Sequence, residues 1–164
     1  MRILSIETSC DETSLAVLDA NGCIGAPKFK IVKHIVASQI KIHAPFGGVV
    51  PNLAKREHLR NLPILLGKIV GISNLKFPFS DETPKGQISK LKNFLKKIDL
   101  ITVTVGPGLE PALWTGIEFA KKLKSFADKN KLKINLLGAN HMEGHLWSFL
   151  LKRDANLRIH ANVA

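Results

Sequence analysis

The fold of this 164-residue chain is decided by two short apolar stretches near its start, Arg2-Ile3-Leu4-Ser5-Ile6-Glu7 and Thr13-Ser14-Leu15-Ala16-Val17-Leu18-Asp19. A polar segment over residues 8–12 separates them. Asn21-Gly22, a pair typical of tight turns, precedes a third apolar stretch from Ile31 to Ser38. The pattern predicts an antiparallel three-strand meander whose first connection carries hydroxyls, a thiol and two carboxylates.

Strands and helices alternate in the rest of the chain. Pro51 begins a helical segment that Pro63 is expected to kink or divide, and its apolar face carries Ala54, His58, Leu62, Leu65, Leu66 and Ile69. Residues 71–87 read as a loop. The later predicted elements are an amphipathic helix from Ile88 to Ile98, a strand from Leu100 to Val105, a helix from Pro111, a strand from Ile134 to Leu137 and a helix carrying His141 and His145. This order indicates an α/β layer structure with a mixed sheet and flanking helices.

Length and composition bound the class of protein. The chain fits one domain or slightly more, and its 45% hydrophobic residues suffice for a core. No apolar run approaches the ~20 residues that span a bilayer, so no membrane association is expected. The chain turns polar directly after Ile6, unlike a secretory signal. Cys10 and Cys23 give no disulfide framework, which indicates a reducing, cytoplasmic setting.

The charge points to a polyanionic partner. The chain has 24 Lys and Arg against 13 Asp and Glu, a net charge of +11, and such an excess is typical of nucleic-acid binding. A surface that is lysine-rich but merely solvated is the competing interpretation. Because no arginine–aromatic pattern marks a base-stacking platform, the charge predicts attraction to a phosphate backbone only.

Two histidines lie four residues apart in Asn140-His141-Met142-Glu143-Gly144-His145. On a helix, such residues share one face with Cβ atoms roughly 5–6 Å apart, so both imidazoles can bind one cation. The zinc-protease signature H-E-x-x-H has its general base directly after the first histidine, where this chain has Met142. The pattern therefore predicts a metal clamp without the protease base; the alternative is two histidines that merely stack. The site is incomplete, because zinc takes about three or four protein ligands and no other His or Cys is suitably spaced.

Three loops are expected to meet at one edge of the sheet, over residues 8–12, 106–110 and 138–145, because sites in α/β folds form where parallel strands end. The first offers backbone N–H groups and hydroxyls to a phosphate and a carboxylate to a cation or proton, or is an ordinary polar hairpin. The second leads into a helix N-terminus, which favours anions, or is a plain strand-to-helix turn.

Several segments together resemble one family. They are Ile6 to Ser14 (IETSCDETS), Ser38-Gln39, His43 with Phe46 to Pro51, Ala54 to His58 (AKREH), Gly106 to Trp114 (GPGLEPALW) and Asn140 to His145 (NHMEGH). In this order they resemble the glycoprotease-like family, the threonylcarbamoyl transferases of tRNA N6-threonylcarbamoyladenosine synthesis. The resemblance covers nearly every segment from Met1 to about Leu150. Asn52 departs from it, standing where the family usually has an acidic residue.

The resemblance implies an actin-like, ribonuclease-H-like lobe at a nucleotide cleft. It makes His141 and His145 ligands of one divalent metal, iron or zinc, and places Asp11 near the reacting centre with Thr8, Ser9 and Cys10 in its loop. The implied reaction transfers a threonylcarbamoyl group from threonylcarbamoyl-adenylate to the N6 amine of the adenosine beside the anticodon. The implied partners are tRNA, that adenylate or another adenine nucleotide, and a paralogous subunit of the same fold.

Family members carry a second lobe that completes the metal site, and this chain shows none. Residues 1–152 are therefore expected to form the N-terminal lobe, residues 153–164 the start of a linker or second lobe, and the tail from Leu157 an unpaired strand. On this interpretation the chain is inactive as it stands. The alternatives are a non-catalytic lobe that docks a partner and, against Met142, a metalloprotease.

Overall fold

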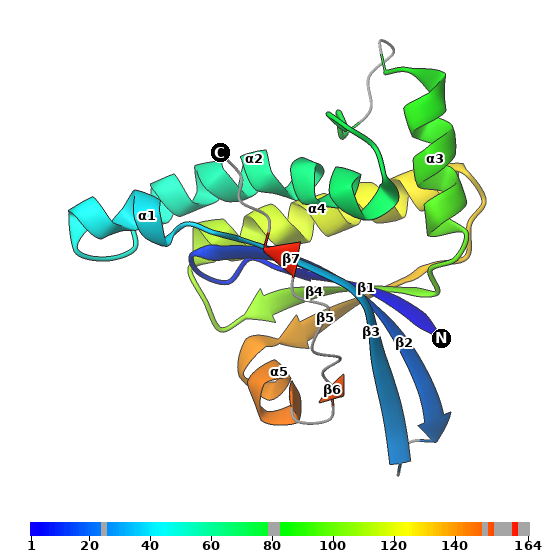
Figure 1. Ribbon diagram of the computed structural model, residues 1–164, viewed down its shortest axis with the longest axis horizontal. Coiled ribbons are helices and arrows are strands. Elements are labelled where there is room, and N and C mark those ends of the chain that lie inside the picture. Colours follow the sequence, from blue (N-terminus) through cyan, green and yellow to red (C-terminus); the bar gives the residue numbers. More distant parts are fainter. Residues whose placement is uncertain (24–25, 79–82, 149–150, 153–158, 161–164) are drawn as a thin grey trace.

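The computed structural model describes residues 1–23, 26–78, 83–148, 151–152 and 159–160. The elements are β1 (Arg2–Glu7), β2 (Glu12–Cys23), β3 (Ala26–Ser38), α1 (Ile40–His43), a 3-10 turn η1 (Ala44–Phe46), α2 (Pro51–Val70), α3 (Lys85–Leu95), β4 (Leu100–Gly106), α4 (Glu110–Lys129), β5 (Asn135–Asn140), α5 (His141–Trp147), β6 (Leu151–Lys152) and β7 (Ile159–His160). Figure 1 shows the arrangement.

The strands form one mixed sheet in the order β5-β4-β1-β2-β3-β6, and β7 also pairs with β3. β2 is antiparallel to both β1 and β3, whereas β4 runs parallel to β1 and β5 runs parallel to β4. The order 3-2-1-4-5 with an antiparallel second strand is that of actin-like and ribonuclease-H-like lobes. The predicted fold class, including the N-terminal meander, is confirmed.

The core lies on one face of the sheet, in rows that cross the strands. Ile6 lies between Leu15 on β2 and Val103 on β4, and Leu4 lies between Val17 and Ile101. All six side chains are buried. Each contributes about 1.5–3 kcal/mol by leaving water. The period of two along each strand therefore selects the buried face.

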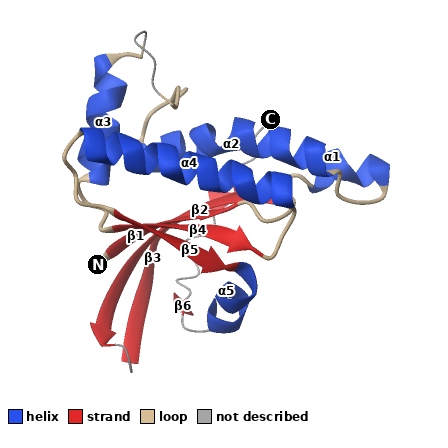
Figure 2. Cartoon of the chain, turned by 180° about the vertical axis from the view of Figure 1, so that it is seen from behind, coloured by secondary structure: helices blue, strands red, loops and turns tan. Residues whose placement is uncertain are grey.

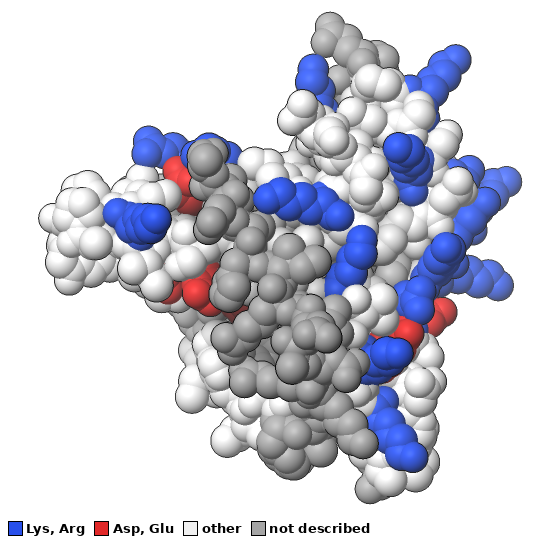
Figure 3. Space-filling view, in the orientation of Figure 1, with Lys and Arg blue, Asp and Glu red and all other residues white. Residues whose placement is uncertain are grey.

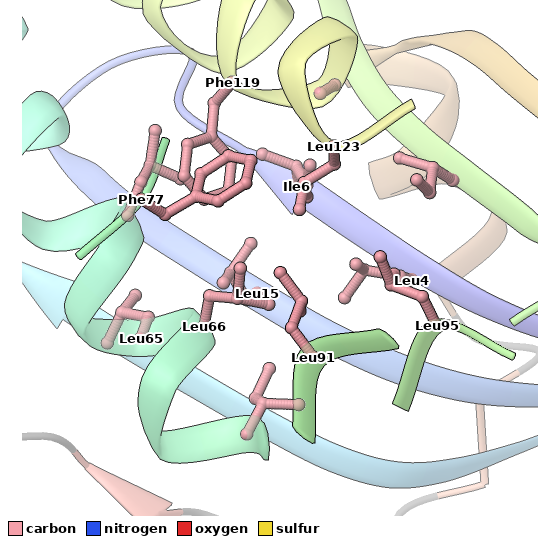
Figure 4. Packing of buried hydrophobic residues seen from close by; sticks show 14 of the residues in the cluster. Leu4, Ile6, Leu15, Leu65, Leu66, Phe77, Leu91, Leu95, Phe119 and Leu123 are labelled. Carbon is pink, nitrogen blue, oxygen red and sulfur yellow. The ribbon is translucent and has the colours of Figure 1, made fainter. Parts of the chain in front are cut away.

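Two long helices cover that face. α2 and α4 lie side by side across it, while α5 lies against the opposite side near β5, as the two opposed views show (Figure 2). The predicted apolar face of α2 is buried as expected, and Phe77 from the following loop packs edge-on against Phe119 of α4 at 5.3 Å between ring centroids (Figure 4). None of the described helices is both long and apolar enough to cross a membrane.

Of the two outcomes expected at Pro63, a kink or a division of the helix, the division is wrong, because α2 runs unbroken from Pro51 to Val70. A proline inside a helix removes one hydrogen bond and costs about 3 kcal/mol. The buried residues on both sides of it offset that cost, namely Asn61, Leu62, Leu65 and Leu66.

Two expectations about strand ends are also corrected. Asn21-Gly22 does not form the turn of the hairpin of β2 and β3, since pairing continues to Cys23 opposite Ala26. Gly22 has a φ of +91°, and a Cβ there would lie 2.4 Å from the Ala26 carbonyl oxygen. Ile159–His160 is not an unpaired strand but pairs in parallel with Ile35 and Val36 of β3. The rest of the predicted linker, residues 153–158 and 161–164, lies outside the described part of the chain.

We expect Gly116→Ala to lower the free energy of unfolding by about 1–3 kcal/mol, because overpacking a tight contact costs that much. A Cβ on Gly116 would lie 2.3 Å from Thr8 Oγ1, where α4 crosses the end of β1. Urea denaturation measures the change. Gly86→Ala is the matched control, since a Cβ there meets nothing within 4 Å; an equal loss in both variants would contradict the packing described.

Candidate metal centre

The three loops expected to converge do so at the carboxyl ends of β1, β4 and β5. The Leu109 N–H donates to the Ser9 carbonyl at 2.8 Å, joining the loop before α4 to the loop after β1. A Cβ on Gly108 would lie 2.5 Å from that same oxygen, so only glycine allows this approach. Ser9 Oγ lies 3.2 Å from His141 Nδ1, which brings the start of α5 to the same place.

His141 and His145 lie on one face of α5, as their spacing predicts. Their ring centroids are 4.6 Å apart at 88°, and their Nε2 atoms are 3.1 Å apart. Asn140 caps the helix, since its side-chain oxygen accepts from the N–H groups of Met142 and Glu143. The cap fixes where the helix begins and so holds the first histidine at the end of β5.

Glu7 orients the first histidine. Its carboxylate accepts from the Ser9 N–H and the Thr104 hydroxyl, and it lies 3.2 Å from His141 Nδ1. Burial alone would raise the pKa of Glu7, but hydrogen bonds from Ser9, Thr104 and His141 outweigh it and hold the pKa below its ordinary value. The carboxylate is therefore ionised, and it holds the proton of His141 on Nδ1.

The donor set fits a divalent metal. With Nδ1–H directed at Glu7, the lone pair of His141 Nε2 is free to face the Nε2 of His145. Zinc–nitrogen bonds of about 2.0–2.1 Å in a tetrahedral site put two nitrogens about 3.3 Å apart, close to the 3.1 Å seen here. A carboxylate behind a ligating histidine is the usual outer partner of such sites. Among the described residues, however, no group of three or more His, Cys, Asp or Glu could hold a metal.

The loop after β1 places the remaining predicted site residues. Ser9 is buried beside His141, Cys10 is an exposed free thiol, and Asp11 is half-buried. Thr8 is fully buried, and its hydroxyl donates to the Ala112 carbonyl at 2.9 Å. The Thr8 side chain thus joins β1 to α4 and does not face the centre.

Sequence reasoning missed the roles of Glu7 and His58. Both stand inside the matched segments, Glu7 as the last residue of β1 and His58 on the inner face of α2. The sequence places His58 on the apolar stripe of its helix and assigns it no further role. His58 and Glu57 are buried, whereas Lys55 and Arg56 are exposed. The signal that could have identified His58 is the presence of a histidine among apolar residues on the buried face of a helix.

Sheet order and site together define an actin-like, ribonuclease-H-like protein with a paired-histidine centre at the ends of its parallel strands. A family model described as TsaD, tRNA N6-adenosine threonylcarbamoyltransferase, matches residues 30–81 and 87–158. The chain belongs to this family.

Curated relatives carry the same description. Proteins named tRNA N6-adenosine threonylcarbamoyltransferase are 43% identical over 150 residues in Thermosipho melanesiensis and 38% identical over 155 residues in Aromatoleum aromaticum. The alignments cover 90% and 94% of this chain but 36% of each relative. The chain thus spans about a third of the length of the relatives it matches.

Solved structures show weaker likenesses. YeaZ from Pseudomonas aeruginosa has a TM-score of 0.38 and 14% identity, over 85% of this chain and 43% of that one. RuvC from Thermus thermophilus has a TM-score of 0.39 and 10% identity, over 87% and 66%.

We expect His141→Ala and His145→Ala each to abolish stoichiometric Co²⁺ binding, because either change leaves a single imidazole. Glu7→Gln should weaken binding about 10–100-fold by loosening the orientation of His141. The visible absorption of Co²⁺ during titration measures both. Glu143→Gln removes the same charge from the exposed side of α5 and should leave affinity unchanged. Undiminished metal stoichiometry in the histidine variants would refute their assignment as ligands.

Proposed function

We propose that this chain supplies the metal-binding lobe for transfer of a threonylcarbamoyl group from threonylcarbamoyl-adenylate to the N6 amine of the adenosine beside the anticodon in tRNA. The observation that carries the proposal is the Glu7–His141–His145 array at the ends of parallel strands, in a chain that belongs to the family. In the transfer, a bond forms between the amine nitrogen and the carbamoyl carbon. The bond from that carbon to the phosphate oxygen breaks, AMP leaves, and the amine loses a proton.

The residues of this chain take separate parts in that reaction. His141 and His145 hold a divalent ion, iron or zinc, both of which accept imidazole, and Glu7 fixes the first ring. When bound, such an ion supplies positive charge to the adenylate phosphate. Asp11 takes the proton from the attacking amine, as a half-buried carboxylate on the same loop as Ser9 can.

The loop after β1 is the proposed phosphate contact. The hydroxyl of Ser9 lies 3.2 Å from His141 Nδ1, and Cys10 follows Ser9 in the same loop. The hydroxyl of Thr8 is already bound to Ala112, so Thr8 contributes by fixing the loop. The loop therefore orients the threonylcarbamoyl-adenylate, while Asp11 acts on the adenosine amine.

Two alternative functions have less support. A metalloprotease needs a base beside the metal, and the corresponding position holds Met142, whose side chain is exposed. A lobe that only docks a partner, such as a paralogous subunit of the same fold, would not need a carboxylate holding His141 in the ligand tautomer. The Glu7 contact therefore favours chemistry over docking alone.

The proposed tRNA surface is the end of the sheet opposite the histidines, called here the basic end: Lys96, Lys97, Lys129, Lys131 and Lys133. These exposed lysines lie just before β4 and β5. The Asn135 N–H donates to the Asp99 carbonyl at 3.1 Å, so the segment between α3 and β4 lies beside the segment between α4 and β5. Lys and Arg gather on this flank, around α3, with few acidic residues among them (Figure 3). Such a surface attracts a phosphate backbone without reading its sequence.

A chimera tests the proposed reaction. Because the chain aligns with 36% of the Thermosipho melanesiensis relative, it can replace the matching part of that protein. We expect the chimera to transfer labelled threonylcarbamoyl to tRNA, and Asp11→Asn to slow transfer about 10²–10⁴-fold, the usual contribution of a general base. Glu12→Gln, at the exposed next residue, is the matched control. A folded, metal-loaded chimera without transfer would favour the docking alternative.

The basic end is tested separately. Lys97→Ala with Lys131→Ala should weaken tRNA binding and reduce its dependence on salt by about one unit of slope per lost phosphate contact. Lys121→Ala with Lys124→Ala removes the same charge from lysines already paired with Glu118 and Asp128, and should have less effect. Filter binding over a salt series measures both. Equal losses in the two variants would mean that net charge, not this surface, attracts the tRNA.

A further inference from the structure

Three successive carbonyls of the loop after β1 are held by three different helical segments. The Ser9 carbonyl accepts from the Leu109 N–H at 2.8 Å, and the Asp11 carbonyl accepts from the Gln39 N–H at 2.9 Å. The Cys10 carbonyl between them accepts from Nε2 of His58 on α2 at 3.0 Å. Of these donors, His58 is the only side chain, so it is the one contact that a substitution can remove.

A series of hydrogen bonds leads to His58 from Val50, the residue before α2, through His43 and Gln39. The Val50 N–H donates to His43 Nδ1 at 3.3 Å, and His43 Nε2 donates to Gln39 Oε1 at 2.9 Å. Gln39 Nε2 then donates to His58 Nδ1 at 3.3 Å, and the Thr13 hydroxyl lies 2.8 Å from the same nitrogen. Every bond points the same way, from the start of α2 to the loop.

The two ends of this series of hydrogen bonds, the Val50 N–H and the Cys10 carbonyl, fix its direction independently. Val50 offers a proton, so His43 must accept on Nδ1 and donate from Nε2, which requires the amide oxygen of Gln39. The Cys10 carbonyl only accepts, so His58 must donate from Nε2 and accept on Nδ1, which requires the amide nitrogen of Gln39. Both requirements give the same orientation of Gln39 and the same neutral Nε2–H form of both histidines.

The surroundings of His58 favour its neutral form. Gln39 and His58 are fully buried and His43 nearly so. Burial lowers the pKa of His58, against the Cys10 carbonyl and the charges of Glu7 and Asp11, which raise it; His43 lowers it further. A second proton on His58 would occupy Nδ1 and oppose the amide nitrogen of Gln39.

We propose that His58, oriented by Gln39 and His43, is a positioning residue that holds the Cys10–Asp11 segment against the paired-histidine centre. The functional meaning of this role rests on the proposed reaction, since Asp11 is the proposed base and Ser9 touches His141. Loss of the bond to the Cys10 carbonyl would remove one of the three hydrogen bonds that hold this segment and so loosen the position of the Asp11 carboxylate relative to His141. None of the three residues touches the reacting groups in this arrangement.

The two cysteines of the chain provide a direct test. Cys10 lies in the held segment and Cys23 at the far end of β2, and both are free, exposed thiols. Partial desolvation and the charge of Asp11 raise the pKa of Cys10, which slows its reaction because the thiolate is the nucleophile. In the full chain, we expect His58→Leu to speed maleimide labelling of Cys10 several-fold while Cys23 is unchanged.

His58→Gln is the matched rescue variant, because its amide keeps an N–H donor close to the position of Nε2. It should restore slow labelling of Cys10, whereas a merely space-filling role for His58 would be served better by leucine. Unchanged labelling of Cys10 in a folded His58→Leu protein would overturn the proposal. So would equally fast labelling in His58→Gln and His58→Leu.

The tautomers of the unaltered protein give a measurement that does not depend on how a variant folds. Nitrogen-15 NMR of the imidazoles should find both His43 and His58 neutral, with the proton on Nε2. A proton on Nδ1 of His58 at neutral pH would refute the proposal even if His58→Leu fails to fold. Neither measurement uses transfer activity, so the proposed reaction can fail while the positioning role stands, and the reverse.

Discussion

The contacts of one partly buried carboxylate, Glu7, join the parts of the centre. As the last residue of the central strand β1, it accepts from Thr104 on β4 and from the N–H of Ser9 in its own loop, and it meets His141 at the start of α5. The ends of three parallel strands are thereby joined through a single side chain. Its loss would leave the hydroxyl of Thr104 and the ring of His141 without this common acceptor. The geometry of the histidine pair therefore depends on the register of the whole sheet.

The elements that were predictable from sequence are those that local periodicity determines. The short apolar stretches of β1 and β2 predict the strands themselves, and the spacing of apolar residues in α2 predicts the stripe that the structure buries. The errors arose where distant contacts override local preference. Pro63 does not divide α2, because the packed residues around it hold the helix, and Asn21-Gly22 does not turn the chain, because strand pairing continues past it.

The centre was predictable in part for the same reason. The spacing of His141 and His145 is a local pattern, so the sequence revealed it. The roles of Glu7 and His58 depend on pairings between residues more than forty positions apart, such as Glu7 with His141 and His58 with Cys10. No periodicity carries that information. The motif segments contained both residues, but only the assembled sheet gives each of them a partner.

The separation of the lysines from the histidines sets a minimum length for a ligand that uses both. The basic end precedes β4 and the centre follows it, and at about 3.3 Å per residue the seven residues of that strand span roughly 20 Å. A mononucleotide or dinucleotide is too small to reach across. A ligand that contacts both the lysines and the histidines must therefore be longer than about 20 Å, which a folded polynucleotide with its reactive base at one end is.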